Sequence, residues 1–177
     1  MNWIRITTLS VAMIWIPLAG NWIADAANAK ILFTVSGPFG TVHGNFTGLK
    51  ATIKFDESDL PGSSISASVD ANTVSTGIGL RNHDLKKEEW LNTDKYPVIS
   101  FQSTKIEKTN AGFKAMGELK LKGIAKPIEI PFTFSPKANA GVFKGQFVIK
   151  RQDYNIVSTS KSVGNEISIS LEVPAKK

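Results

Sequence analysis

The sequence contains no cysteine, and only two of its 177 residues are histidine. Without cysteine the chain forms no disulfide, carries no lipidated cysteine, and offers no zinc site of the usual Cys/His kind. Catalytic motifs are equally scarce, since the sequence has no nucleophile elbow, glycine-rich phosphate loop or metalloprotease helix. We therefore expect a protein that is not an enzyme, has no metal or catalytic cofactor, and is stabilised by an ordinary packed core.

Long hydrophobic runs are also missing, because no apolar segment reaches the roughly 20 residues of a membrane-spanning helix. A shorter apolar run at residues 11–16 follows Arg5 and precedes small residues around Ala26 and Ala29. This order predicts a signal peptide over residues 1–26, with cleavage after Ala26 or Ala29. An uncleaved anchor helix is the alternative, which the short and interrupted run disfavours. We expect a periplasmic or secreted protein that is soluble once the signal peptide is removed.

Apolar and polar residues alternate through the rest of the chain, which is typical of strands with one buried face. Turn residues such as Pro61-Gly62, Asn110 and Asn139 separate the alternating segments. The eight predicted strands include residues 31–35, 49–55, 65–71, 99–101, 113–121, 128–134, 143–149 and 167–173. The pattern predicts an all-β domain over residues 30–174, folded as an eight-stranded antiparallel barrel of the lipocalin-like kind.

Two segments depart from this alternation. Glycines at positions 37, 40, 44 and 48 indicate bulges or bends near the start of the sheet. Residues 79–92 lack alternation and contain good helix formers, so we predict one short helical insert there. Asn82 is the candidate cap of this helix, and Leu85 and Trp90 are expected to turn inward.

Arginine is rare, since only three of the 21 basic residues are Arg, and the formal net charge of +6 comes from scattered lysines. Scattered lysines without interleaved aromatics make nucleic acid an unexpected partner. After removal of the leader only Arg81 and Arg151 remain, close to Asp84 and Asp153 respectively. Each arginine either forms a local ion pair that ties a loop to the barrel rim or holds the polar head of a ligand.

Several short motifs in order along the chain resemble the YceI-like family, the bacterial polyisoprenoid-binding proteins with a lipocalin-like barrel. These motifs are Gly44-Asn45-Phe46, Ala51 to Asp56, Ser75-Thr76-Gly77, Leu80-Arg81-Asn82, Trp90-Leu91-Asn92, Tyr96-Pro97, Gly117 to Gly123 and Arg151-Gln152-Asp153-Tyr154. The chain departs from the family pattern at Asn82, where the family has Asp, and at Asp84 and Lys122, where it has His. Family roles that depend on those histidines therefore do not carry over.

The resemblance implies that the barrel holds a long apolar lipid, such as an isoprenoid or an isoprenoid quinone. The candidate ligand-binding residues are Phe33, Phe55, Leu80, Arg81, Leu85, Trp90, Phe101, Phe113, Phe132, Phe134, Phe147 and Arg151. Some of these phenylalanines are equally compatible with a filled core. An envelope stress-associated scaffold without lipid cargo is the alternative function, and an enzyme site around Arg81, Asp84 and Asp153 is a weaker one. A transient membrane contact and a homodimer stay open as further partner predictions.

Overall fold

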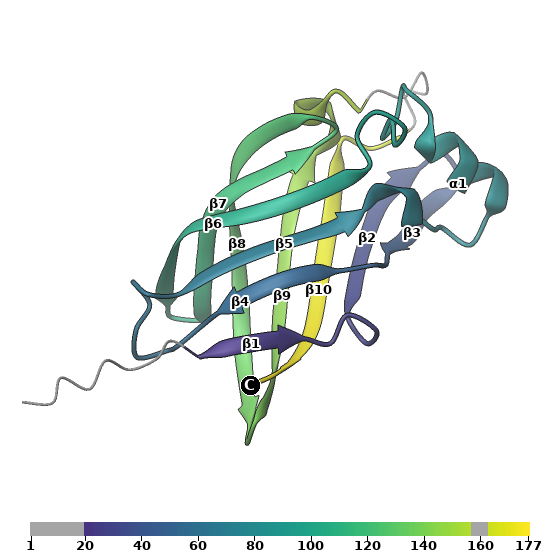
Figure 1. The fold of residues 1–177 in the computed structure, drawn as a ribbon. Coiled ribbons are helices and arrows are strands. Elements are labelled where there is room, and N and C mark those ends of the chain that lie inside the picture. The colour runs from purple at the N-terminus through teal and green to yellow at the C-terminus, as the bar shows by residue number, and fades with distance from the viewer. Residues whose placement is uncertain (1–19, 157–162) are drawn as a thin grey trace, which may run out of the picture.

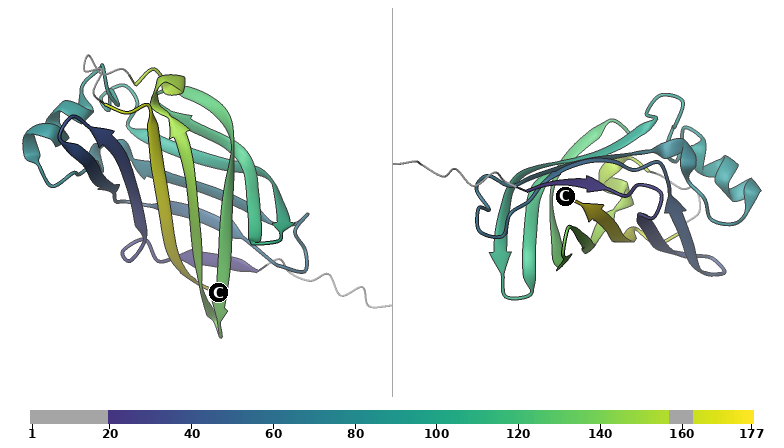
Figure 2. Two further views of the ribbon diagram at one scale, coloured as in Figure 1. Left: turned by 180° about the vertical axis from the view of Figure 1, so that it is seen from behind. Right: turned by 60° about the horizontal axis from the view of Figure 1, so that its bottom comes forward.

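The computed structural model describes residues 20–156 and 163–177, which form a strongly twisted sheet of long antiparallel strands (Figures 1 and 2). In chain order the elements are β1 (Asn21–Ala24), β2 (Lys30–Gly37), β3 (Gly40–Phe46), β4 (Lys50–Lys54), β5 (Ser64–Asp70), the 3₁₀ turn η1 (Ala71–Thr73), α1 (Gly79–Lys86), β6 (Val98–Thr109), β7 (Gly112–Leu121), β8 (Ile124–Lys137), β9 (Ala140–Lys150), the 3₁₀ turn η2 (Arg151–Tyr154) and β10 (Glu166–Lys176).

Eight of these strands close into a ring. Strands β4 to β10 pair with their sequence neighbours, and β1 pairs with both β4 and β10. In β1, Trp22 lies opposite Ile53 of β4, while Ala24 lies opposite Ala175 of β10. The predicted all-β fold, an eight-stranded antiparallel barrel with one short helix, is therefore confirmed. The barrel begins at Asn21, however, and not near residue 30.

Strands β2 and β3 form a hairpin that continues the sheet beyond β10. Strand β10 pairs along its first half with β2 and at its end with β1, so two separate strands share one of its edges. The far end of β3 is joined to the chain after η1 by two backbone hydrogen bonds between Asn45 and Ser75, of 2.9 and 3.0 Å. This hairpin therefore closes the half of the barrel that β1 does not reach.

The glycines in this hairpin correct one sequence-based prediction. Gly37 and Gly40 face each other at the hairpin turn, and Gly44 lies inside the regular strand β3. The ring of Phe33 on β2 lies so close to Gly44 that a Cβ atom there would be 2.2 Å from it. Because Gly44 has no side chain, the Phe33 ring fits against β3. The predicted bend is found at the turn between Gly37 and Gly40, whereas Gly44 lies in a regular strand.

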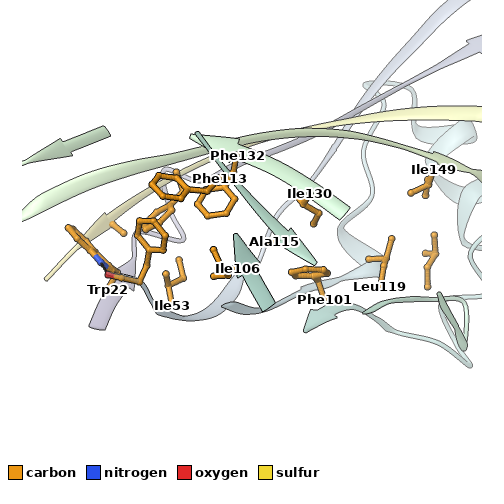
Figure 3. Packing of buried hydrophobic residues seen from close by; sticks show 14 of the residues in the cluster. Trp22, Ile53, Phe101, Ile106, Phe113, Ala115, Leu119, Ile130, Phe132 and Ile149 are labelled. Atoms are coloured by element: carbon orange, nitrogen blue, oxygen red, sulfur yellow. Dashed lines mark hydrogen bonds between the residues drawn. The ribbon is translucent and has the colours of Figure 1, made fainter. Parts of the chain in front are cut away.

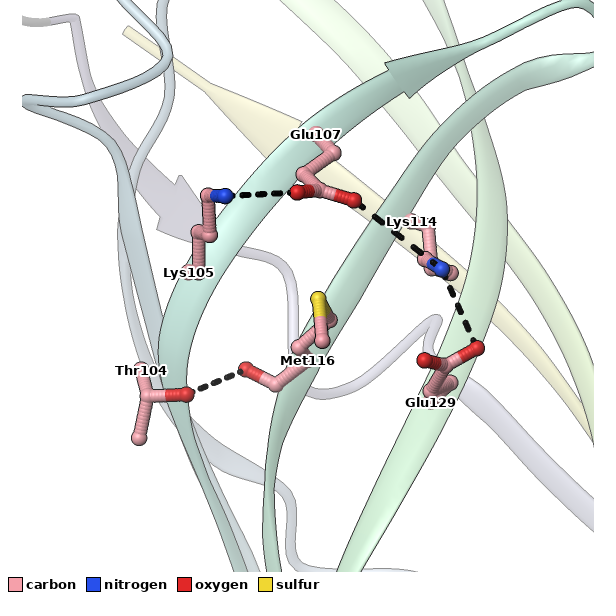
Figure 4. A network of polar contacts seen from close by, with 6 residues as sticks. All are labelled: Thr104, Lys105, Glu107, Lys114, Met116 and Glu129. Carbon is pink, nitrogen blue, oxygen red and sulfur yellow. Dashed lines mark hydrogen bonds and ion pairs between the residues drawn. The ribbon is translucent and has the colours of Figure 1, made fainter.

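The outer face of the long strands is polar, as the alternation requires. Figure 4 shows Lys114 on β7 between Glu107 on β6 and Glu129 on β8, with Nζ–Oε2 distances of 3.9 and 3.1 Å. Lys105 approaches the other oxygen of Glu107 to 2.6 Å, and this hydrogen bond holds the pKa of Glu107 below its usual range. Such exposed pairs contribute little to stability, but they keep the outer face of the sheet hydrated.

Helix α1 is shorter than the predicted segment and ends at Lys86, after which a series of turns leads to Asn92. Asn82 is not its cap: the N-cap is Ile78, and Asn82 Oδ1 accepts hydrogen bonds from the backbone N and Oγ1 of Thr76, both at 2.8 Å. Across residues 20–156 and 163–177, no helix is both long and apolar enough to cross a membrane.

Candidate ligand-binding site

One end of the barrel interior is filled by aromatic rings, which we call the aromatic plug: Trp22, Phe55, Phe113, Phe132, Phe134 and Phe143. Phe55 is at its centre, with ring centroids of four other phenylalanines 5.0 to 5.6 Å away. Trp22 contacts Phe134 edge-on at 4.8 Å, and its indole Nε1 donates to the carbonyl of Phe55 at 2.9 Å. Edge-to-face rings at these separations attract one another, so this end is densely packed.

The other end of the interior is hollow. A partly open cavity of about 260 Å³ lies there, and its lining is almost entirely aliphatic and aromatic. In Figure 3, Trp22, Phe113 and Phe132 gather at one end of the row of buried side chains, whereas Phe101, Leu119 and Ile149 are spread out toward the other. Inward residues such as Phe33 and Phe147 remain partly exposed because no side chain fills the space in front of them.

Small inward residues create part of this space. Ala51 on β4 lies opposite Ala67 on β5, which in turn lies opposite Phe101 on β6, and all three line the cavity. The row therefore has two methyl groups where the plug has phenyl rings. A core of ordinary protein density leaves few voids larger than a water molecule. This cavity is larger, and the small side chains at these inward positions account for part of it.

The structure divides the twelve predicted ligand-binding residues into three groups. Seven line the cavity: Phe33, Leu85, Trp90, Phe101, Phe132, Phe147 and Arg151. Phe55, Phe113 and Phe134 belong to the aromatic plug and are not part of the lining, because they lie too far toward the closed end. Leu80 and Arg81 lie on α1 outside the lining, and the Leu80 side chain is 75% exposed.

Most of the aliphatic lining is missing from the sequence-based prediction. It comes from strands all around the barrel, and its β2 and β10 members include Ile31, Val35, Ile167, Ile169, Leu171 and Val173. They carry the same period-two signal as the phenylalanines, so counting every inward apolar position, and not only the aromatic ones, would have included them.

Arg151 is buried beside the cavity, and its guanidinium bonds the backbone of three residues that follow η2, Ile156, Val163 and Gly164. Its Nε donates to the carbonyl of Gly164 at 2.9 Å, Nη1 to that of Ile156 at 2.9 Å and Nη2 to that of Val163 at 3.0 Å. The expected ion pair with Asp153 does not form, since the guanidinium donates to three backbone carbonyls and Asp153 is exposed. Three directed donors on one planar group explain why Arg and not Lys occupies this position.

The acidic residue of α1, Asp84, forms a surface ion pair. Asp84 accepts a hydrogen bond from Lys87 Nζ at 2.6 Å, which lowers the pKa of the Asp84 carboxyl, and both side chains are about half exposed. The predicted ion pair between Arg81 and Asp84 is absent from the contacts of the described chain, and neither residue lines the cavity.

Lys122, where the family has histidine, is in an unusual setting for a lysine. Its Nζ donates to the carbonyl of Asn155 at 2.7 Å, and partial burial lowers the pKa of its amine. The residue therefore ties the end of β7 to the chain after η2. Within the described residues, no three His, Cys, Asp or Glu side chains are grouped as a metal site requires.

Comparison with models of known protein families identifies the family of this chain. The model of the YceI-like domain matches residues 22–175. The chain belongs to the YceI-like family. The match starts at Trp22 and thus includes β1, as the structure does. A UPF0312 protein of Yersinia enterocolitica is 27% identical over 142 residues, which cover 76% of this chain and 73% of that protein.

Two solved structures share the fold of this chain. BcnA of Burkholderia cenocepacia superposes with a TM-score of 0.82 at 23% identity, covering 87% of this chain and all of that one. A polyisoprenoid-binding domain from Saccharophagus degradans, implicated in plant cell wall breakdown, gives a TM-score of 0.67 at 16% identity, covering 90% and 98% of the two chains. At these identities the similarity establishes the architecture.

Proposed function

We propose that this YceI-like protein binds a lipid with a polyisoprenoid tail in the hollow end of its barrel and carries it outside the cytoplasm. The observation that carries the proposal is the partly open cavity of about 260 Å³ with its apolar lining. A structural neighbour, the Saccharophagus degradans domain, is described as polyisoprenoid-binding. Sites for small molecules usually start at roughly 300 Å³, so the cavity accommodates part of a long tail.

The energetics suit such a tail without any strong polar contact. Burial of each CH₂ group contributes roughly 0.8 kcal/mol, so about ten buried carbons give roughly 8 kcal/mol before costs. Lost translational freedom and side-chain ordering oppose binding by several kcal/mol or more. A tail that buries about ten carbons should therefore bind more weakly than the micromolar range, which requires about 8 kcal/mol net, and weak binding allows a carrier to release its cargo.

The layout of the site favours one orientation of the lipid. The aromatic plug closes one end, so the hydrocarbon tail points toward Phe132 and the polar head stays near Arg151. A guanidinium has five N–H donors and a permanent positive charge. Within the described residues three of these donors bond backbone carbonyls, and the charge suits a head group with oxygen acceptors, such as the carbonyls of an isoprenoid quinone.

The test is to titrate the purified protein with a polyprenol and an isoprenoid quinone, and to analyse an organic extract of the protein by mass spectrometry. Ala67→Phe places a ring in the cavity beside Phe101 and is expected to weaken binding at least tenfold. Ala125→Phe is the matched control, because Ala125 is exposed on β8 outside the lining. Equal affinities of the two variants, or an extract without lipid, would contradict the proposal and favour the scaffold alternative.

We also propose that the cargo is exchanged during transient contact with an anionic membrane through α1. Ile78 and Leu80 expose apolar side chains at the start of this helix, and Lys86 and Lys87 lie at its end. Apolar anchors beside basic residues suit the surface of an anionic bilayer. In cosedimentation with phosphatidylglycerol vesicles, Leu80→Ser should reduce binding. Val148→Ser, which removes an exposed apolar residue from the barrel wall, should not reduce binding.

The predicted homodimer is tested separately, by measuring the molar mass of the purified protein in solution by light scattering.

A further inference from the structure

Strand β1 is the closing element of the barrel. It is the only strand in the described chain that pairs with both β4 and β10, so it joins the first and last strands of the ring. On one side Trp22 lies opposite Ile53, and on the other Ile23 lies opposite Lys176. Figure 1 shows β1 crossing the end of the barrel next to the C-terminus. Without β1, β4 and β10 have no strand between them.

The side chain of Trp22 makes this closure part of the core. Trp22 is 5% exposed, packs edge-on against Phe134 and Phe143 of the aromatic plug, and donates its indole N–H to Phe55. The Lys177 ammonium lies over the Trp22 ring, 5.2 Å from the ring centroid. Loss of Trp22 would thus open the plug to water and leave the Phe55 carbonyl without its donor.

The small residues after β1 have a structural role of their own. Asp25 accepts hydrogen bonds from the backbone N and the side-chain Nδ2 of Asn28, at 3.3 and 2.9 Å. The backbone N of Asp25 also donates to the carbonyl of Pro174 at 2.8 Å. These hydrogen bonds fix a short loop, after which β2 continues along β10 in the same direction as β1. The small residues around Ala26 and Ala29 thus belong to a folded connection, although they also resemble a peptidase site.

We propose that signal peptidase cleaves this chain directly before β1, after Ala19 or Gly20, and that β1 stays in the mature protein. Cleavage after Ala19 or Gly20 places a small residue directly before the cleaved bond, with Pro17 or Leu18 two residues upstream. The carbonyl of Gly20 accepts a hydrogen bond from the Phe55 backbone N at 2.9 Å, so the folded domain already includes this residue. Cleavage after Ala26 or Ala29 would remove the strand that closes the ring. The inference rests on the proposed export and is independent of the lipid.

The first experiment expresses the full chain in a bacterium with its own leader and determines the N-terminus of the exported protein by Edman sequencing and intact mass. A mature chain that starts at Gly20 or Asn21 is expected. A start at Ala27 or Lys30 would overturn the inference. An unprocessed chain retained in the cytoplasm would overturn the inference together with the proposed export, and lipid binding, measured separately, would be unaffected.

The second experiment tests β1 without relying on export. Chains that begin at Gly20 and at Lys30 are produced in the cytoplasm without a leader and compared by thermal unfolding. We expect the shorter chain to melt roughly 10 °C lower or to stay unfolded, because it lacks a buried tryptophan and a closing strand. Equal melting temperatures would overturn the inference.

A third measurement remains informative when the shorter chain does not fold. Trp90→Phe leaves Trp22 as the only tryptophan after residue 20. The exported variant should then fluoresce with the blue-shifted emission of a buried indole and should resist quenching by iodide. An exported variant without tryptophan fluorescence would show that Trp22 had been removed, and would overturn the inference.

Discussion

The two ends of the barrel interior are built from the same kinds of residue and yet differ in what they do. At the closed end, the six aromatic rings of the plug pack against one another, and four of them surround Phe55. At the hollow end, Phe33, Phe101 and Phe147 surround a cavity, because Ala51 and Ala67 stand where further rings would be needed to fill it. The closed end therefore stabilises the fold, and the hollow end has room for a ligand.

The largest loss of stability is expected for a substitution in the aromatic plug at the closed end. Phe55→Ala removes the ring at the centre of the plug and should lower the free energy of unfolding by about 3–5 kcal/mol, because a large cavity opens in a dense core. Phe147→Ala at the hollow end should cost clearly less, since that ring already faces open space. Urea unfolding of both variants measures the difference, and similar losses would contradict the distinction between the two ends.

A smaller loss of stability is expected for a substitution of Arg151, which lies beside the cavity at the hollow end. Arg151→Lys keeps the charge but cannot make three directed hydrogen bonds to Gly164, Ile156 and Val163. We expect the free energy of unfolding to fall by about 2 kcal/mol, as is usual when hydrogen bonds of a buried charged group are lost. Arg81→Lys on α1 is the control and should stay within about 0.5 kcal/mol of the parent. Denaturant midpoints that match in the two variants would show that Arg151 has no special structural role.

Gly44→Ala tests whether the position of the Phe33 ring shapes the hollow end. The new Cβ would lie 2.2 Å from the Phe33 ring, so the ring must move or the β2–β3 hairpin must shift. Overpacking of this kind typically costs about 1–3 kcal/mol, and we expect weaker polyprenol binding as well, since Phe33 lines the cavity. Gly79→Ala, where no atom lies within 4 Å, serves as the control. Unchanged stability and binding in Gly44→Ala would mean that this ring does not shape the site.

The smallest effect on stability is expected from Glu172, on the outer wall of the barrel. Hydrogen bonds from Lys30 and Lys144 lower the pKa of Glu172. Because the folded-state pKa lies below the unfolded value of about 4.3, the carboxylate stabilises the fold above that pH. This contribution is lost as the pH falls through the folded-state pKa. Glu172→Gln should therefore flatten the pH dependence of the urea midpoint slightly below pH ~4.3, and added salt should shrink the difference from the parent. A larger effect at high salt would refute this.

Most of the fold could be predicted from the sequence because strands with one buried face leave a period-two pattern. Strands β4 to β10 all carry it. Strand β3 does not, since Gly44 interrupts its inward row between Val42 and Phe46, and a hairpin strand was therefore taken for bends. Strand β1 was missed for a different reason: four residues after an apolar leader are too few to show any period.

The candidate site was predicted less completely than the fold. Alternation correctly indicated that Phe55 and Phe101 both face inward, but it carries no information on their position along the barrel axis. That position depends on the tilt of the strands and on pairings between residues far apart in the chain, such as Ala67 with Phe101.

The sequence by itself determined the strand pattern, the membership in the YceI-like family and the absence of any disulfide, because these follow from residue types and local periodicity. Only the tertiary structure decided which phenylalanines fill the barrel and which line its cavity. It also decided that Trp22 belongs to the core. Both depend on which distant strands meet, since a side chain is buried or left facing open space by its neighbours in three dimensions and not by its own sequence.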